Sequence, residues 1–408
     1  MSNENQTTSE VHRIPAAAYA LCLCIGLVGA NSLALGPIAP RVAESFASGV
    51  PAVMTASAAF GIGTAASALL LAGLIDRFGA GRVLRYALLA FLAALAASGA
   101  APVLPAFVGA QLLAGLAAGL ALPAIYTLAA LAAPAGRESD TLGIVLFGWT
   151  LSMVAGVSLS AVIADLLGWR MVYAIVVVAG LAAMAGTTKL TAAGNATGRG
   201  APSPLSALRV PGIAPLLLAC AAFMASFYGV YAYVGDHLHR GLGLPVSAGG
   251  LLALCYGLGF GATTFLDRWI DRLGPARLLP LFFTIVGGVY LVMTVASASY
   301  LALLAVVFFW GMANHAALNV LILRLASLDP SRRGAIMGLN SGVTYLALFA
   351  GTTGFGPLYA RAGFPALAGL AVALMLVAAL AAALATRSVI PGQAAGLSPE
   401  PRTDAGSR

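Results

Sequence analysis

The sequence predicts an all-α integral membrane protein with twelve transmembrane helices, arranged as two parallel halves of six. Three observations lead to this fold class. Of the 408 residues, 61% are hydrophobic and only 8% are charged, whereas an ordinary soluble domain is about a quarter charged. Twelve apolar stretches are long enough to cross a bilayer, and one charged motif recurs 195 residues further along the chain. Lipid rather than water must therefore surround most of this surface.

Each predicted span is a run of roughly 20 mostly apolar residues, the length that crosses the hydrocarbon core of a bilayer. We expect helices because lipid cannot hydrogen-bond to open backbone groups. The sequence lacks the alternating segments, each of about ten residues, that form an outer-membrane barrel. In chain order the predicted spans are 15–38, 51–73, 83–100, 104–131, 141–164, 170–189, 212–235, 246–266, 278–296, 300–323, 335–358 and 364–386.

The twelve spans divide into two homologous halves. The motif D-R-x-G-x-x-R occurs in LIDRFGAGRVL, residues 74–84, and again in WIDRLGPARLL, residues 269–279. The same spacing joins Arg137 to Arg332. Six spans is an even number, so both halves have one orientation, as in many secondary transporters whose substrate site lies near the midplane. The predicted parts are a tail (1–14), the N-terminal half (15–189), a linker (190–211), the C-terminal half (212–386) and a second tail (387–408).

Lysine and arginine predict the orientation of these spans. With both termini in the cytoplasm, 17 of the 21 basic residues lie on the cytoplasmic side, as the positive-inside rule requires. This distribution also explains the net charge of +8 without nucleic acid as a partner. The four basic residues that remain on the other side are Arg41, Arg170, Arg240 and Arg361.

The sequence shows no sign of catalysis. It contains no HExxH, GxSxG or GxxxxGK[ST] pattern, the motifs of zinc hydrolases, serine hydrolases and nucleotide-driven pumps. The cysteines Cys22, Cys24, Cys220 and Cys255 are scattered through apolar runs, and we interpret them as small buried hydrophobic residues. We therefore expect no enzyme activity, no cofactor and no metal site.

Three segments resemble a known family. The loop GLIDRFGAGRVL resembles the signature loop between spans two and three of the major facilitator superfamily, and WIDRLGPARLL is its second copy between spans eight and nine. VSLSAVIADLLGWRMVY and RRGAIMGLNSGVTYLALFAG resemble spans five and eleven of its bacterial drug and sugar (arabinose-type) efflux permeases. The resemblance implies a secondary active transporter that moves a small organic solute by alternating access, with efflux as the preferred interpretation. The alternatives are a facilitative or uptake transporter of a small metabolite and a membrane sensor built on the same scaffold.

The sequence departs from that branch at positions that bear on the coupling of transport to protons. Gln111 stands where the branch has an arginine in span four, and Ser158 and Ser160 replace a proline and a glycine of its antiporter signature in span five. These departures weigh against antiport with protons in particular.

The resemblance also implies a gate between the halves. In that family Asp76 would dock against span eleven and Asp271 against span five, closing the cytoplasmic side. A carboxylate at a helix N-terminus is stabilised by about 0.3–1 kcal/mol, and the two glycines permit a tight turn. The alternative is that these are solvated loop charges that only set topology. The predicted gate residues are Asp76, Arg77, Gly79, Arg82, Asp271, Arg272, Gly274 and Arg277.

Polar residues inside the spans are the candidates for cargo and proton binding. An ionisable residue at membrane depth is a functional candidate by default, and His315 could exchange protons near neutrality. It could equally be a neutral ring bonded to Asn314 or Asn319 between helices. The predicted substrate-binding residues are Asn31, Gln111, Tyr228, Tyr231, Asn314, His315 and Asn319, with Trp149, Asn340 and Tyr345 as weaker candidates.

The second candidate for proton coupling is Asp236, near the outer end of span seven. No Asp or Glu lies deep in any predicted span, which favours a neutral or weakly polar cargo. The expected partners are a small-molecule substrate and the lipid bilayer, with protons as a further candidate. We expect a monomer in the bacterial inner (plasma) membrane.

Overall fold

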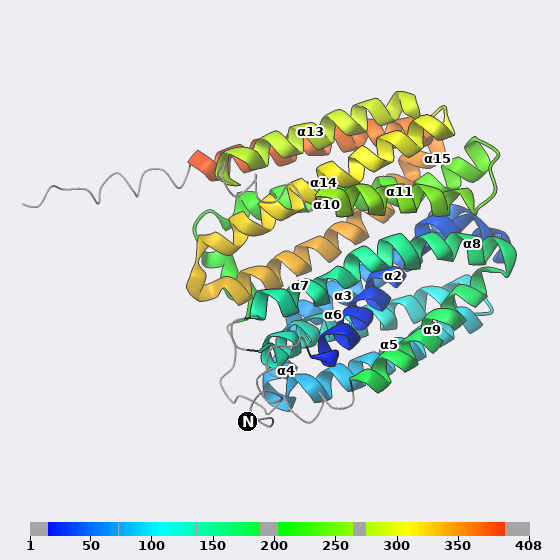
Figure 1. Ribbon diagram of the computed structural model, residues 1–408. Helices are drawn as coiled ribbons and strands as arrows, with labels where there is room; N and C mark the ends of the chain where they lie inside the picture. The colour runs from blue at the N-terminus through cyan, green and yellow to red at the C-terminus, as the bar shows by residue number, and fades with distance from the viewer. Residues whose placement is uncertain (1–14, 72, 135–136, 188–202, 264–274, 388–408) are drawn as a thin grey trace, which may run out of the picture.

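The computed structural model describes residues 15–71, 73–134, 137–187, 203–263 and 275–387, and its ordered elements are helices that lie side by side (Figure 1). In the first half these are α2 (Ala16–Ser45), α3 (Val50–Leu70), α4 (Gly73–Phe78), α5 (Ala80–Ala100), α6 (Leu104–Ala132), α7 (Glu138–Leu151), η1 (Ser152–Val157), α8 (Ser158–Leu166) and α9 (Trp169–Gly186). In the second they are η3 (Pro204–Arg209), α10 (Ile213–Asp236), η4 (His237–Gly241), α11 (Ala248–Ala262), α13 (Pro275–Ala296), α14 (Tyr300–Leu328), η6 (Pro330–Arg332) and α15 (Arg333–Arg387).

Every predicted span corresponds to a helix in the described residues. Ten helices in that part of the chain are long and apolar enough to cross a membrane, and α11 is a shorter apolar helix. One of the ten carries two spans, because α15 breaks at Gly363, whose φ of 71° is the left-handed conformation that glycine adopts without strain. The twelve-helix prediction is therefore confirmed.

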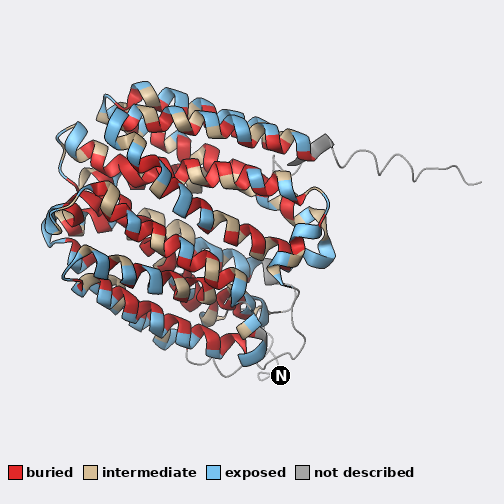
Figure 2. Ribbon diagram, turned by 180° about the vertical axis from the view of Figure 1, so that it is seen from behind, coloured by how far each residue is buried: buried red, intermediate tan, exposed pale blue. Residues whose placement is uncertain are grey.

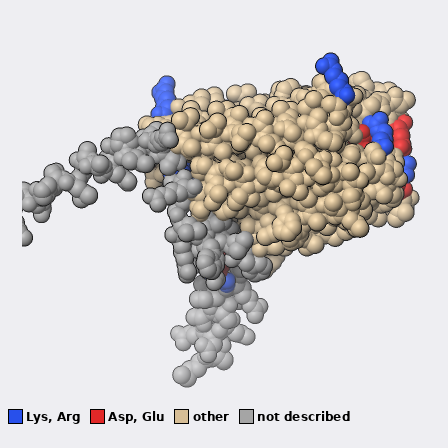
Figure 3. All heavy atoms as spheres, turned by 90° about the horizontal axis from the view of Figure 1, so that it is seen from above, with Lys and Arg blue, Asp and Glu red and all other residues tan. Residues whose placement is uncertain are grey.

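The surface of the bundle matches a lipid solvent. Figure 2 shows buried residues turned towards neighbouring helices and exposed residues turned outward. The outward residues are largely apolar, including Val295 and Leu301, which are 79% and 77% exposed. Figure 3 shows acidic and basic side chains meeting at the end of the molecule away from the grey segments, with a wide uncharged surface between the ends.

Glycines set the closest helix contacts, and they do so in the same way in both halves. A Cβ at Gly115 of α6 would overlap the carbonyl oxygen of Phe60 on α3, and a Cβ at Gly311 of α14 would overlap that of Tyr256 on α11. Each residue of the second pair follows its counterpart by 196 residues. Small residues at such crossings let transmembrane helices approach closely. The fold thus repeats its packing, and not only its loop sequence.

The two halves meet through three sets of helices: α3 packs on α15, the α7–η1–α8 segment packs on α11, and α2 packs on α10. By contrast α6 and α14, which are described throughout, make no substantial contact with each other. We call the side of the bundle where α2 begins and α15 ends, towards the left of Figure 1, the terminal end. The close approach of Gly36 on α2 to the carbonyl oxygen of Tyr231 on α10 lies towards the opposite end.

Candidate transport site

Asn31 and Gln111 are brought together inside the first half, where they bind each other. The Nδ2 of Asn31 on α2 donates to Oε1 of Gln111 on α6 at 3.1 Å, and Nε2 of Gln111 lies 3.4 Å from Oδ1 of Asn31. Nε2 of Gln111 also donates to Oγ of Ser98 on α5 at 3.1 Å. Both amides are buried. This geometry favours a bond that holds three helices together over a role in cargo binding.

The second half contains an aromatic core around Tyr256 of α11. Its hydroxyl accepts a hydrogen bond from Nδ2 of Asn314 at 3.0 Å, and its ring lies 5.0 Å from that of Trp310 on α14. Tyr231 is buried in this core, 6.5 Å from Trp310 between ring centroids. Tyr256 was not among the predicted site residues, although a tyrosine in a glycine-rich apolar span is a signal that could have found it.

Four aromatic side chains, two from each half, lie within hydrogen-bond or electrostatic range of one another, and we call them the inter-half aromatic cluster. Trp149 of α7 donates from Nε1 to the hydroxyl of Tyr126 on α6 at 3.3 Å. The hydroxyl of Tyr345 on α15 lies within electrostatic range of those of Tyr126 and Tyr228. Trp149, Tyr126 and Tyr228 are only partly buried. Tyr126 was not among the sequence candidates, because a tyrosine near the end of a span is typical of an interfacial anchor.

His315 and Asn319 lie one turn apart on α14, and both are partly buried. The imidazole of His315 meets the ring of Phe260 on α11 edge to face, with 4.7 Å between centroids. Roles for His315 in proton exchange and for Asn319 in cargo binding stay predictions.

Two buried amide oxygens have no hydrogen-bond partner among the described residues: Oδ1 of Asn314 on α14 and Oδ1 of Asn340 on α15. Since buried polar atoms are normally satisfied, these two acceptors are candidates for contact with cargo.

Asp236 is the last residue of α10, at the end of the bundle away from the terminal end, where neighbouring side chains bind it. Arg240 donates to both of its carboxylate oxygens, at 2.6 and 2.8 Å, and the hydroxyl of Tyr359 donates to Oδ2 at 2.7 Å. The carboxylate is almost completely buried. These three bonds favour a structural role for Asp236, and proton coupling through it stays a prediction.

The carboxylates whose side chains are described all lie near helix ends. Asp329, between α14 and η6, accepts hydrogen bonds from the hydroxyl and the backbone N–H of Ser331 at 2.6 and 2.9 Å. These bonds hold the pKa of Asp329 below its usual value. The others are Glu44, Asp140, Asp165 and Asp236. Within the described residues, the middle of the bundle is therefore free of acidic side chains.

The predicted gate is described only in part. Gly79 has a φ of 85°, so the tight turn expected after α4 is present. The guanidinium of Arg77 lies over the ring of Phe78, 5.2 Å from its centroid, and Arg82 is exposed. Asp271, Arg272 and Gly274 lie outside the described residues, as do the side chains of Asp76 and Arg277. Their roles remain predictions.

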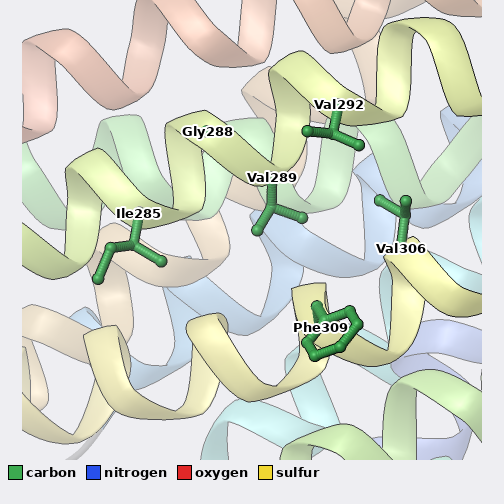
Figure 4. Close-up of a pocket in the computed structure, with 6 residues that line it drawn as sticks. All are labelled: Ile285, Gly288, Val289, Val292, Val306 and Phe309. Atoms are coloured by element: carbon green, nitrogen blue, oxygen red, sulfur yellow. The ribbon is translucent and has the colours of Figure 1, made fainter.

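A groove of about 410 Å³ runs between α13 and α14. Figure 4 shows its lining, which is entirely apolar: Ile285, Gly288, Val289, Val292, Val306 and Phe309. Phe309 is 59% exposed on the outer surface of the bundle. This groove faces lipid and offers no polar group that could orient a solute.

Comparison with known proteins assigns the chain to a family. The model of the Major Facilitator Superfamily matches residues 21–352. The chloramphenicol resistance protein of Streptomyces lividans is 30% identical over 388 residues, covering 90% of this chain and 96% of that protein. YwfA of Bacillus subtilis (strain 168), described as an uncharacterized MFS-type transporter, is 25% identical, covering 90% and 91%. The crystal structure of a mutant of the nucleoside transporter NupG has the same fold, with a TM-score of 0.74 at 14% identity, covering 91% of this chain and 100% of that one. The chain is a multi-pass membrane protein and belongs to the Major Facilitator Superfamily of transporters.

Proposed function

We propose that this transporter exports a small, uncharged, partly apolar organic solute by alternating access between its halves. The observation that carries the proposal is the inter-half aromatic cluster, which offers hydroxyl, indole and ring surfaces and no carboxylate. Side chains of this kind suit cargo that is bound by ring stacking and single hydrogen bonds. The oxygens of Asn314 and Asn340 described above add acceptors for a hydroxyl or amide N–H on the cargo.

The proposed direction and the first cargo to test come from the Streptomyces relative, whose name describes resistance to chloramphenicol. Resistance through a transporter is most simply achieved by export. Chloramphenicol is an uncharged aromatic amide with two hydroxyl groups, so it is compatible with the cluster. In this proposal the chain lies in the bacterial inner membrane with the terminal end in the cytoplasm, as the distribution of basic residues supports.

The described structure also fits one stage of the proposed transport cycle, the state open to the cytoplasm. The halves meet at the opposite end through α2 and α10, while α6 and α14 stay apart. In the proposed orientation this is the state that admits cargo from the cytoplasm. Energy for export would come from an ion gradient, with His315 as the candidate proton carrier at membrane depth.

The test is transport in proteoliposomes loaded with radiolabelled chloramphenicol, with and without an imposed pH gradient. We expect Tyr126→Phe to raise KM about two- to tenfold, the range that one lost hydrogen bond produces. Tyr86→Phe is the matched control, because Tyr86 lies 69% exposed on α5, and it should leave KM unchanged.

Equal KM values in the two variants would show that the aromatic cluster does not bind cargo. The imposed pH gradient distinguishes two mechanisms. Movement of chloramphenicol against its own concentration gradient only when the pH gradient is present supports proton-coupled export. Equilibration of chloramphenicol with or without the pH gradient supports a facilitative transporter. If chloramphenicol is not moved at all, a panel of uncharged aromatic solutes against charged ones tests the cargo class.

A further inference from the structure

Charged side chains from both halves meet at the opposite end of the bundle, which is the outer end in the proposed orientation. In the first half, Arg41 near the end of α2 lies 3.2 Å from Glu44 and 2.7 Å from Asp165 of α8. The second half contributes two contacts: the backbone N–H of Ser247 donates to Asp165 at 3.3 Å, and Nε2 of His239 in η4 lies 3.4 Å from Oε1 of Glu44. These are polar contacts across the seam between halves that must separate in alternating access.

The imidazole of His239 has a fixed orientation. Its Nδ1 lies 2.8 Å from the carbonyl oxygen of Leu244. A carbonyl oxygen can only accept, so Nδ1 carries a hydrogen in this arrangement. In neutral histidine the other nitrogen then has a lone pair and no hydrogen. Nε2 is therefore the nitrogen whose charge state changes on protonation, and it is the one that faces Glu44.

The contact between Nε2 and Glu44 needs a proton. Without one, a lone pair faces a carboxylate, which is repulsive. With one, an imidazolium N–H faces the carboxylate, or a protonated carboxyl faces the ring. In either case the pair holds one proton while the halves are together. His239 and Glu44 have side chains that are 26% and 53% exposed, so this proton exchanges directly with water at that end.

The surrounding charges do not replace this proton. Arg41 is shared between Glu44 and Asp165, and Arg240 is bound to the buried Asp236, although it also lies within electrostatic range of Glu44. The other titratable or charged groups at this end are bound elsewhere or exposed. Arg170 on α9 donates to Ser45 and to the carbonyl oxygen of Ala101, and Tyr359 donates to Asp236. His237 of η4 lies against the carbonyl oxygen of Ser297 within its own half, and Arg361 on α15 is exposed.

We propose that His239 and Glu44 form a proton-binding site that latches the outer end of the transporter shut. The closed contact at this end forms when the pair holds a proton, so acid outside the membrane favours the state closed to the outside. The sign follows from linkage: the closed state binds one proton more than the open state, so its population falls as pH rises. The proposal rests on alternating access in this family and is independent of cargo and direction.

The test measures the opening of the outer end without cargo. The full chain, with its four cysteines replaced, carries spin labels at Val103→Cys before α6 and Leu301→Cys on α14, both exposed at that end. Distances between the labels are measured by pulsed electron resonance in lipid nanodiscs over roughly two to three pH units around the ordinary pKa of histidine, about 6.5. We expect the ratio of long to short distances to rise about two- to fivefold with pH, the size of effect that a half-exposed ion pair produces.

Two histidine variants decide the outcome. His239→Gln keeps a donor towards Glu44 but cannot titrate, and it should remove the pH dependence. His237→Gln is the matched control in the same short helix η4, and it should keep the pH dependence because His237 is bonded within its own half. The proposal is overturned if the pH dependence survives in His239→Gln, or if the native chain shows no pH dependence. Thermal melting of each variant identifies loss of folding, and Glu44→Gln, which should also flatten the pH profile, provides a second test.

Discussion

At the scale of single residues, polar groups inside the bundle divide between those hydrogen-bonded to protein and those for which the described residues show no such bond. Asn31 and Gln111 belong to the first kind, because each amide is bonded to the other. Tyr228 and Asn340 belong to the second: Tyr228 is only partly buried, and Oδ1 of Asn340 is buried without a partner. The sequence placed all four in spans but could not separate the two kinds, since the partner of each side chain lies on a helix distant in sequence.

Replacing Gln111 tests this division. Gln111→Leu should lower the free energy of unfolding by about 1–2 kcal/mol, because Asn31 is left buried without its partner. The loss is measured by denaturant titration in mixed micelles. The double variant Asn31→Leu with Gln111→Leu should recover part of it, because both polar groups are then absent. A raised KM for cargo at unchanged stability would instead indicate that Gln111 contacts cargo.

At the scale of helices, apolar length was sufficient to predict each span, but not its exact ends or its internal geometry. α2 runs on to Ser45, beyond the predicted end of its span at residue 38, since a helix does not stop where the bilayer does. The span from Glu138 to Leu166 contains a π-helical segment at Ser152–Val157. The hydroxyl of Ser158 donates to the carbonyl oxygen of Met153, five residues earlier, at 3.1 Å. Such π-bulges depend on the packing partner and are frequent at functional sites.

The glycine crossings offer a test at this scale. Gly115→Ala should destabilise the protein by about 1–3 kcal/mol, because the new methyl group meets backbone atoms of Phe60 that cannot move away as a flexible side chain would. Gly109→Ala, on the same helix α6, has no atom within 4 Å of the new Cβ and should be neutral or slightly stabilising. Melting temperatures in detergent compare the two. An equal fall in both would show that the loss does not come from the crossing, since helix propensity alone favours alanine over glycine.

At the scale of the whole molecule, the duplication could be predicted and the state of the transporter could not. A shared spacing of motifs is visible in a single sequence, and the contacts of Gly115 recur at Gly311 in the second half. Which end is closed is decided by a small difference between two packings of the same chain. The pairing of His239 with Glu44 across the seam therefore becomes visible only in the structure.

The gate at the terminal end is the last property that belongs to the molecule as a whole. If Asp76 stabilises the state in which this end is closed, Asp76→Asn should slow transport about two- to fivefold, which corresponds to the 0.3–1 kcal/mol of a carboxylate near a helix N-terminus. Initial transport rates in proteoliposomes are compared at equal protein content. Asp140→Asn is the matched control, because Asp140 pairs with Arg137 within one turn and is exposed at the same end. Slowing by Asp140→Asn as well would assign the effect to surface charge near the membrane, whereas slowing by Asp76→Asn alone requires a contact that forms in one state and breaks in the other.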